Sequence, residues 1–233
     1  MTGPFTEQDR LLFIGDSITD SGRDRSDPNS LGAGYVRQIA AALNAPAVLN
    51  KGLNGNRIYD MKARWATDVL AERPTVVTVK IGINDTWRTF DRGLASPIDR
   101  FHAAYTSVLA QTRRHLTADL YIITPFLLPV RAEQHSWMDD LAPRIEVARE
   151  LAAEFGARLV RADLIMPKAA AEHGAATLAP DGVHPSGLGH RILAAAWLDA
   201  AGVPPPHTWA HTDETGPDHQ VRARPATQEP EGP

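Results

Sequence analysis

LLFIGDSITD, residues 11–20, takes a run of apolar side chains directly into a polar Gly-Asp-Ser turn. A short apolar run that ends in turn residues is typical of a buried strand in a parallel sheet. The same pattern recurs along the chain, and its clearest example is the β-branched stretch at residues 75–82. We therefore expect strands at residues 11–15, 47–50, 75–82, 119–125 and 157–163.

Segments with helical spacing of apolar residues separate these strands. They lie at residues 35–43, 58–71, 98–115, 141–155 and 188–201, and Gly156 is placed to end the fourth helix. Strands that alternate with amphipathic helices indicate a parallel sheet covered on both faces. The sequence therefore predicts an α/β fold, a three-layer α/β/α sandwich with a central parallel sheet, in one domain over residues 1–202.

Residues 203–233 differ in composition from the rest of the chain. They begin with VPPP and end with QEPEGP, and they are rich in Pro, Thr, Asp and Glu. Such a segment buries too little apolar surface to offset the entropy lost on ordering. We expect a Pro-rich, disordered C-terminal tail.

Composition excludes several classes of protein. The 233 residues are 43% hydrophobic, enough for one sizeable core, and 24 Lys and Arg against 28 Asp and Glu give a net charge of -4. This balance argues against a nucleic-acid partner, which needs a basic surface. No apolar run is long enough for a membrane helix, and residues 1–10 lack the pattern of a signal peptide. The absence of cysteine excludes a disulfide framework and a thiolate metal site. It also fits the cytoplasmic location that we expect, and homo-oligomerisation is left open.

Polar motifs stand at the carboxyl ends of the expected strands, where open parallel sheets bind their ligands. They are GDS at residues 15–17, NKGLNGN at 50–56 and GIND at 82–85, and a fourth motif, DGVHP at 181–185, precedes the last helix. Each alone is ordinary turn chemistry. Together they would converge on one crevice.

Three of these side chains fit nucleophilic catalysis. Ser17 would attack an acyl carbonyl, His184 would take its proton, and Asp181 would orient the imidazole. The resulting oxyanion needs fixed hydrogen-bond donors. Candidates are the backbone N–H groups of Ser17 and Gly55 and the side-chain amide of Asn84, while Gly52 and Gly55 also read as turn glycines.

Trp87 and Arg88 follow Asn84 closely and are expected on the rim of the crevice. An aromatic face suits stacking on a sugar ring, and a guanidinium suits its hydroxyl groups. The alternative is structural: Trp87 packs into the wall, and Arg88 pairs with Asp91 or Asp85. The residues alone leave both interpretations open.

The four motifs resemble those of the SGNH hydrolases, also called GDSL esterases and lipases. The family's Ser, Gly, Asn and His match Ser17, Gly55, Asn84 and His184, and Asp181 matches its triad aspartate. The resemblance implies a flavodoxin-like fold and a serine ester hydrolase without metal or organic cofactor. The family pattern also favours Gly55 over Gly52 as the oxyanion glycine.

A narrower resemblance covers about residues 10–200. The stretches NKGLNGNRIYDMKARWATDVLA, IGINDTWRTFD and DGVHPSGLGHRILAAAWL are similar to bacterial intracellular acetylxylan esterases of the SGNH type. This implies removal of acetyl groups from acetylated xylo-oligosaccharides or similar sugars. The alternatives are a short-chain carboxylesterase, lysophospholipase or thioesterase of the same superfamily, and a non-catalytic ligand-binding protein on this fold.

Overall fold

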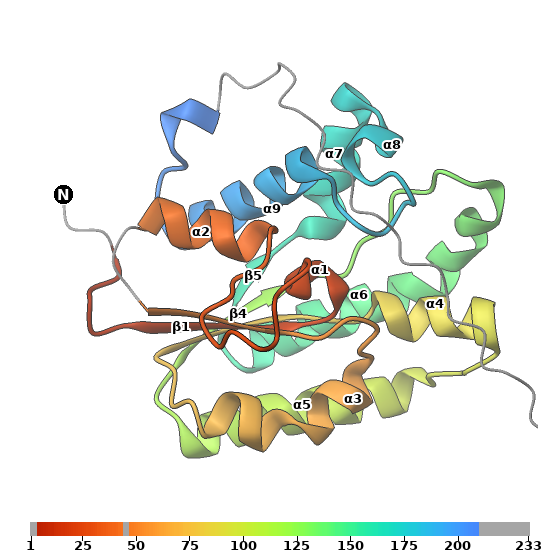
Figure 1. The fold of residues 1–233 in the computed structure, drawn as a ribbon. Helices are drawn as coiled ribbons and strands as arrows, with labels where there is room; N and C mark the ends of the chain where they lie inside the picture. The colour runs from red at the N-terminus through yellow and green to blue at the C-terminus, as the bar shows by residue number, and fades with distance from the viewer. Residues whose placement is uncertain (1–3, 44–46, 210–233) are drawn as a thin grey trace, which may run out of the picture.

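The computed structural model describes residues 4–43 and 47–209 and contains one five-stranded sheet in the order β2-β1-β3-β4-β5 (Figure 1). All four strand pairings are parallel. The strands are β1 (Arg10–Gly15), β2 (Ala47–Gly52), β3 (Val76–Lys80), β4 (Asp119–Ile123) and β5 (Arg158–Val160). The predicted parallel sheet is confirmed.

Helices follow the strands and cover both faces of the sheet. The regular helices are α1 (Ser17–Asp20), α2 (Tyr35–Leu43), α3 (Ile58–Ala63), α4 (Ile83–Arg92), α5 (Ile98–His115), α6 (Trp137–Glu154), α7 (Ala162–His173), α8 (Ala175–Leu178) and α9 (Gly187–Ala200). A π-helical turn, η1 (Ala66–Leu70), and two 3₁₀ turns, η2 (Ala132–Ser136) and η3 (His207–Trp209), complete the described elements. In Figure 1, α2 and α9 lie above the sheet, and α3 and α5 lie below it.

Side chains that alternate along β1 build a separate core on each face. Leu11 and Phe13 pack with the first core cluster, which includes Trp197 of α9, whereas Leu12 and Ile14 pack with the second, which includes Trp65. All six side chains are fully buried. Burial of this kind contributes about 1.5–3 kcal/mol for each large apolar side chain. The three-layer sandwich is therefore confirmed, with its sheet buried on both faces.

The expected helix over residues 58–71 is wrong in its middle. α3 ends at Ala63, and the chain continues through a π-helical turn in which the Ala71 N–H donates to the Ala66 carbonyl at 2.9 Å. The irregular turn lets Trp65 enter the core completely while the neighbouring Arg64 faces the strand ends. The regular helix is thus interrupted where Trp65, which is buried in the core, follows Arg64, which binds the strand ends.

Other boundaries also differ from the prediction. Residues 83–92 and 162–173 are also helical, which was not expected; the first of these helices is amphipathic, and the second contains Pro167. The last strand ends at Val160 instead of extending to residue 163, and the chain continues into α7 from Ala162. The ending of α6 is as expected, since Gly156 takes a positive φ of 60° and Ala157 N–H donates to the Ala152 carbonyl.

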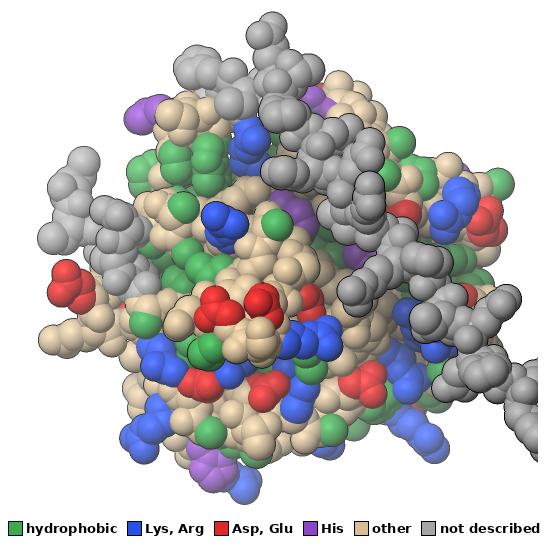
Figure 2. All heavy atoms as spheres, in the orientation of Figure 1, with side chains coloured by type: hydrophobic (Ala, Val, Ile, Leu, Met, Phe, Trp, Pro, Cys, Tyr) green, Lys and Arg blue, Asp and Glu red, His purple; other side chains and the backbone are tan. Residues whose placement is uncertain are grey.

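Part of the expected tail lies on the domain. Val203 and Trp209 are partly buried against the first core cluster, while residues 210–233 fall outside the described part of the chain. Within residues 4–43 and 47–209, every helix is too short or too polar to cross a membrane. Figure 2 shows Lys and Arg side chains interleaved with Asp and Glu on the visible face.

Candidate active site

Ser17 stands at a sharp turn beyond the carboxyl end of β1. It is the first residue of α1, and Asp16 caps this short helix by accepting the Ile18 N–H at 3.0 Å. The strand ends in glycine because there is no room for a side chain: a Cβ on Gly15 would lie 2.2 Å from the Lys80 carbonyl oxygen. The close approach of β1 and β3 therefore fixes the place of Ser17.

A buried ion pair lies beneath this turn. Lys80 Nζ is 3.5 Å from Asp16 Oδ2, and both side chains are completely buried. Burial lowers the pKa of Lys80, while the Asp16 carboxylate opposes that change. Because Asp16 also caps α1, Lys80 holds the cap that precedes Ser17.

Ser17, His184 and Asp181 form one continuous chain of hydrogen bonds. Ser17 Oγ is 2.9 Å from His184 Nε2, and His184 Nδ1 is 2.6 Å from Asp181 Oδ2. The other carboxylate oxygen of Asp181 accepts the backbone N–H groups of Val183 and His184 at 2.9 and 2.8 Å. The structure thus brings together the three residues that the sequence predicts as a triad.

The environment of Asp181 favours its ionised form. Burial alone would raise its pKa, but hydrogen bonds from the His184 side chain and from two backbone N–H groups outweigh burial and lower the pKa to about 2. The carboxylate is therefore charged at neutral pH, and a charged carboxylate next to Nδ1 places the imidazole proton there. His184 Nε2 then presents a lone pair to Ser17.

Gln134 holds the loop that carries Asp181. This fully buried side chain donates to the Asp181 carbonyl at 2.7 Å and accepts the Val130 N–H at 2.9 Å. Gly182 passes close by at φ 86°, where a Cβ would lie 2.7 Å from Gln134 Oε1. Sequence reasoning missed Gln134, because its partners are distant in sequence and no local motif marks it.

The two expected oxyanion residues lie on neighbouring segments. Asn84 is in the first turn of α4, is buried, and donates its side-chain N–H to the Asn56 carbonyl at 3.2 Å. Gly55 precedes Asn56 and has φ 79° with open space around its Cα. Gly52 is different, because a Cβ there would lie 2.1 Å from the Asp20 nitrogen. Gly52 therefore serves close packing, and Gly55 is the glycine with free space.

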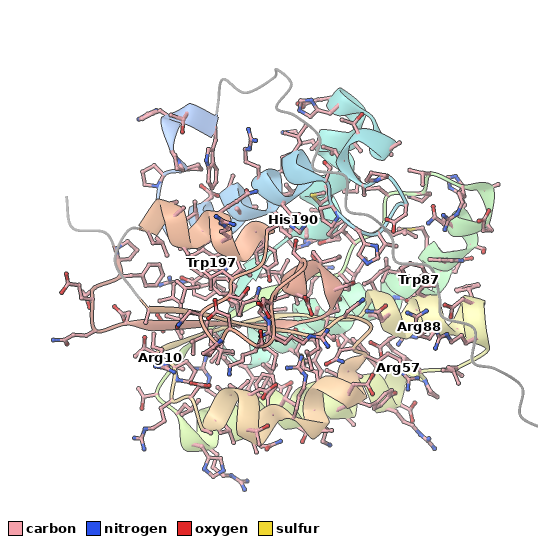
Figure 3. The ribbon with its side chains drawn as sticks, in the orientation of Figure 1. Arg10, Arg57, Trp87, Arg88, His190 and Trp197 are labelled. Carbon is pink, nitrogen blue, oxygen red and sulfur yellow. The ribbon has the colours of Figure 1, made fainter. Side chains whose placement is uncertain are left out.

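Trp87 and Arg88 both project from α4 (Figure 3). The Trp87 ring lies 5.8 Å from the His184 ring and 5.7 Å from the Trp137 ring, so it borders the triad and packs into the wall. Arg88 forms an ion pair with Asp91 and lies over the Trp87 ring at 5.3 Å. Arg88 thus pairs with Asp91, as the structural interpretation expects. Trp87 both packs into the wall, against Trp137, and borders the triad at His184.

A groove of about 700 Å³ opens beside the triad. Residues from α1, the loops after α1 and β2, the loop before α9 and α9 itself line it, and they include both apolar side chains and the polar side chains of Ser17, Asp20, Arg25, Asn54, His184 and His190. A mostly apolar surface with a few polar groups is typical of a small-molecule site, and these polar groups can exchange hydrogen bonds with the hydroxyl groups of a ligand.

The groove contains a second Ser–His pair, Ser21 and His190, 3.3 Å apart. His190 lies on α9 and accepts the Tyr35 N–H at Nδ1, so its Nε2 carries the proton and donates to Ser21 Oγ. Burial, together with the nearby charge of Lys80, lowers the pKa of His190 to about 4. His190 is therefore neutral at pH 7, and it has no lone pair to activate Ser21.

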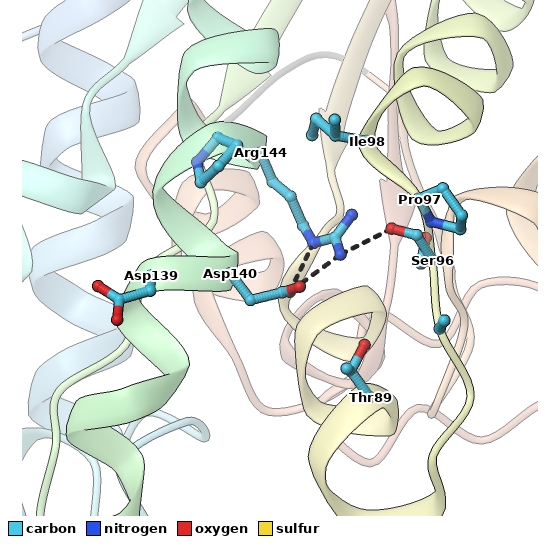
Figure 4. Close-up of a pocket in the computed structure, with 9 residues that line it drawn as sticks. Thr89, Ser96, Pro97, Ile98, Asp139, Asp140 and Arg144 are labelled. Atoms are coloured by element: carbon cyan, nitrogen blue, oxygen red, sulfur yellow. Dashed lines mark hydrogen bonds and ion pairs between the residues drawn. The ribbon is translucent and has the colours of Figure 1, made fainter.

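A second cavity, of about 310 Å³, lies between α4, the loop before α5, and α6 (Figure 4). Its buried Arg144 donates to the Ser96 carbonyl at 2.8 Å, to Thr86 Oγ1 at 3.1 Å and to Asp140. Thr86 follows Asn84 and Asp85 on α4. Arg144 therefore anchors the helix that carries Asn84, and the cavity holds none of the triad residues.

Comparison with known proteins finds acetylxylan esterases that are similar to this chain in sequence and in structure. An acetylxylan esterase of Geobacillus stearothermophilus is 36% identical over 208 residues, covering 83% of this chain and 94% of that protein. The structure of Axe2, an acetylxylan esterase from the same organism, matches with a TM-score of 0.79 at 34% identity, over 87% of this chain and 97% of the other.

A second solved structure extends the likeness beyond that organism. LAE5, an α/β hydrolase enzyme from the metagenome of Lake Arreo, matches with a TM-score of 0.79 at 29% identity, covering 85% of this chain and 97% of the other. The GDSL-like lipase/acylhydrolase family matches residues 13–192, a stretch that includes Ser17, Asp181 and His184. The chain belongs to the GDSL-like lipase/acylhydrolase family.

Proposed function

We propose that this protein is a serine esterase that removes acetyl groups from acetylated xylo-oligosaccharides or similar sugars. The observation that carries the proposal is the unbroken chain Ser17 Oγ–His184–Asp181, with distances of 2.9 and 2.6 Å. Nucleophile, base and orienting carboxylate within hydrogen-bond reach are what acyl transfer requires.

In the first half of the reaction, Ser17 Oγ attacks the acetyl carbonyl carbon while His184 Nε2 takes the hydroxyl proton. The negative charge on the carbonyl oxygen is stabilised by the backbone N–H groups of Ser17 and Gly55 and by the Asn84 side chain. His184 then gives its proton to the sugar oxygen as the ester bond breaks. The acetyl group remains on Ser17.

In the second half, water takes the place of the sugar hydroxyl. His184 Nε2 removes a proton from the water, whose oxygen attacks the acetyl-Ser17 carbonyl, and the proton returns to Ser17 Oγ as acetate leaves. Asp181 stabilises the imidazolium in both halves and stays ionised, in keeping with its pKa of about 2.

Two observations favour an acetylated sugar as substrate. Relatives that match nearly the full domain are acetylxylan esterases, and catalytic mutants of one of them alter a serine, an aspartate and a histidine. In this chain, Trp87 lies next to the His184 ring, and the groove beside the triad presents the polar side chains of Asp20, Arg25 and Asn54. The absence of cysteine fits a reducing compartment, so we place the activity in the cytoplasm.

The test is acetate release from acetylated xylo-oligosaccharides, with Ser17→Ala as the control. The proposal predicts release by the wild type and none by the variant. Hydrolysis of p-nitrophenyl acetate without release from the sugar would retain the Ser17 mechanism and redirect the substrate to another short-chain ester. No hydrolysis of either ester would overturn the proposed function.

A further inference from the structure

Arg64 places its guanidinium among the segments that meet at the candidate active site. It donates to the Gly15 carbonyl at 3.1 Å, to the Lys51 carbonyl at 2.7 Å and to Asn56 Oδ1 at 2.7 Å. Asp68 pairs with it at 2.7 Å, and only 14% of the side chain is exposed. One side chain thereby joins the carboxyl ends of β1 and β2 to the loop that follows β2.

The irregular helix brings Arg64 to this position. α3 ends at Ala63, and the π-helical turn begins at Ala66, so Arg64 stands at the junction between them. A regular helix would keep its residues at a fixed angular spacing, whereas a π-helical turn changes that spacing locally and is frequent at functional sites. At this junction the Arg64 side chain points toward the carboxyl ends of β1 and β2.

The partners of Arg64 are next to the reacting groups. Gly15 lies two residues before Ser17, and its carbonyl also accepts the Leu53 N–H at 3.1 Å. Asn56 follows Gly55, and the Asn56 carbonyl accepts the side-chain N–H of Asn84 at 3.2 Å. Arg64 therefore contacts the nucleophile turn directly and reaches Asn84 through a single residue, Asn56.

We propose that Arg64 is a positioning residue for the esterase reaction, holding the Ser17 turn and the Gly55–Asn56 loop at a fixed separation. This role rests on the proposed function, because it presumes that Ser17 attacks the carbonyl and that Gly55 and Asn84 bind the oxyanion. A planar, forked guanidinium donates in several fixed directions at once, and lysine cannot reproduce that pattern. Arg64 itself does not touch the reacting atoms.

The expected loss falls on kcat. Displacement of catalytic groups by about 1 Å can cost on the order of a hundredfold in rate. We therefore expect Arg64→Lys and Arg64→Gln to lower kcat for p-nitrophenyl acetate by about tenfold to a hundredfold, with a smaller change in KM, in protein that unfolds cooperatively on heating.

The matched control is Arg113, another arginine that binds backbone carbonyls. Arg113 donates to the Ala118 carbonyl at 2.8 Å and to the Phe155 carbonyl. Ala118 precedes β4, so Arg113 lies at the amino ends of the strands, whereas the candidate active site lies at their carboxyl ends. Arg113→Gln should lower thermal stability without changing kcat. A second control, Asp68→Asn, removes only the outer ion pair of Arg64 and should leave kcat close to that of the wild type.

A double-mutant cycle separates positioning from general destabilisation. If Arg64 acts through Asn56 on Asn84, then Arg64→Gln should cost much less kcat in an Asn84→Ala background than in the wild type. Asn56→Ala provides a second variant that keeps the buried charge, and it should lower kcat in the same direction even if Arg64→Gln does not fold.

The outcomes distinguish this role from the proposed function. A folded wild type that turns over no ester overturns the function and this role together. An active wild type overturns the role of Arg64 alone if folded Arg64 and Asn56 variants keep kcat within about twofold. Losses at Arg64 and Asn84 that multiply independently also overturn the proposed coupling.

Discussion

At the scale of single residues, Ser17 and His184 meet although 167 positions separate them in the chain. Their chemistry could be predicted because serine, histidine and aspartate occur in motifs that suit acyl transfer. The imidazole tautomer could not be predicted, because it depends on the 2.6 Å contact of Nδ1 with Asp181. That contact leaves the Nε2 lone pair facing Ser17.

The role of Asn84 has a measurable consequence. If its side-chain amide binds the oxyanion, Asn84→Ala should lower kcat by about 10²–10³-fold, as loss of one such donor does in serine hydrolases. KM should change little, because the donor acts mainly on the transition state. Steady-state kinetics measures both constants.

Asn29→Ala, on an exposed loop, is the control for that measurement. It should retain the wild-type kcat. A loss of tenfold or less in folded Asn84→Ala protein would make Asn84 a turn residue, held there by its bond to the Asn56 carbonyl.

Several residues that shape the site have no signal in the sequence. Gln134 binds the Asp181 carbonyl from 47 positions away, Arg64 binds the Gly15 carbonyl from 49, and Lys80 pairs with Asp16 from 64. Each partner is a backbone oxygen or a turn residue, which can be recognised only after the chain has folded. Such support therefore has to be read from the structure.

Among the elements, the glycine that ends β2 and the glycine in the loop after it should respond differently to alanine. A Cβ on Gly52 would lie 2.1 Å from the Asp20 backbone nitrogen, so Gly52→Ala should destabilise the fold by about 3 kcal/mol or more. Gly55→Ala meets no atom within 4 Å and should cost only about 1–2 kcal/mol for its positive φ. Urea unfolding of both variants checks this order, and the reverse order would contradict the close packing of β2 against α1.

The buried pair beneath the nucleophile turn gives another prediction. Lys80→Met leaves the Asp16 carboxylate buried without its cation, so it should cost about 3–5 kcal/mol of stability. Adding Asp16→Asn to that variant should restore much of the loss, because no buried charge remains. Chemical denaturation of the single and double variants measures the effect. A double variant no more stable than Lys80→Met would show that the pair does not act as a unit.

The elements themselves were predictable to different degrees. The helices at residues 35–43 and 98–115 begin and end as expected, because their apolar periodicity is regular. The helix at 83–92 was not expected, although it is amphipathic, because Asn84 and Asp85 in its first turn are residues that favour turns. Site residues at the start of a helix can thus conceal the pattern by which the helix is recognised.

At the scale of the whole molecule, Asp85 links stability to pH. Burial raises its pKa from 3.8 to about 7, against hydrogen bonds from Ser96 and Ile58 and the charge of Arg144. Between these two pH values the folded protein holds a proton that the unfolded chain has lost. The contribution of Asp85 to stability therefore falls as pH rises from about 4 to about 7.

Asp85→Asn isolates this contribution, because asparagine does not titrate and keeps an acceptor for the Ile58 N–H. The stability of the wild type relative to the variant should be smaller near pH 8 than near pH 5. His190 contributes with the opposite sign, but it is present in both proteins and cancels. Urea unfolding at the two pH values measures the difference, and a difference independent of pH would contradict the raised pKa.

The proposed reaction depends on one activated serine, which a serine-directed organophosphate would label covalently. Mass spectrometry of the treated protein, followed by peptide mapping, would locate the adduct. We expect one adduct per chain, on Ser17, and none in Ser17→Ala or at Ser21, whose partner His190 cannot take its proton. An unlabelled wild type, or an adduct on another residue, would show that Ser17 is not the activated nucleophile.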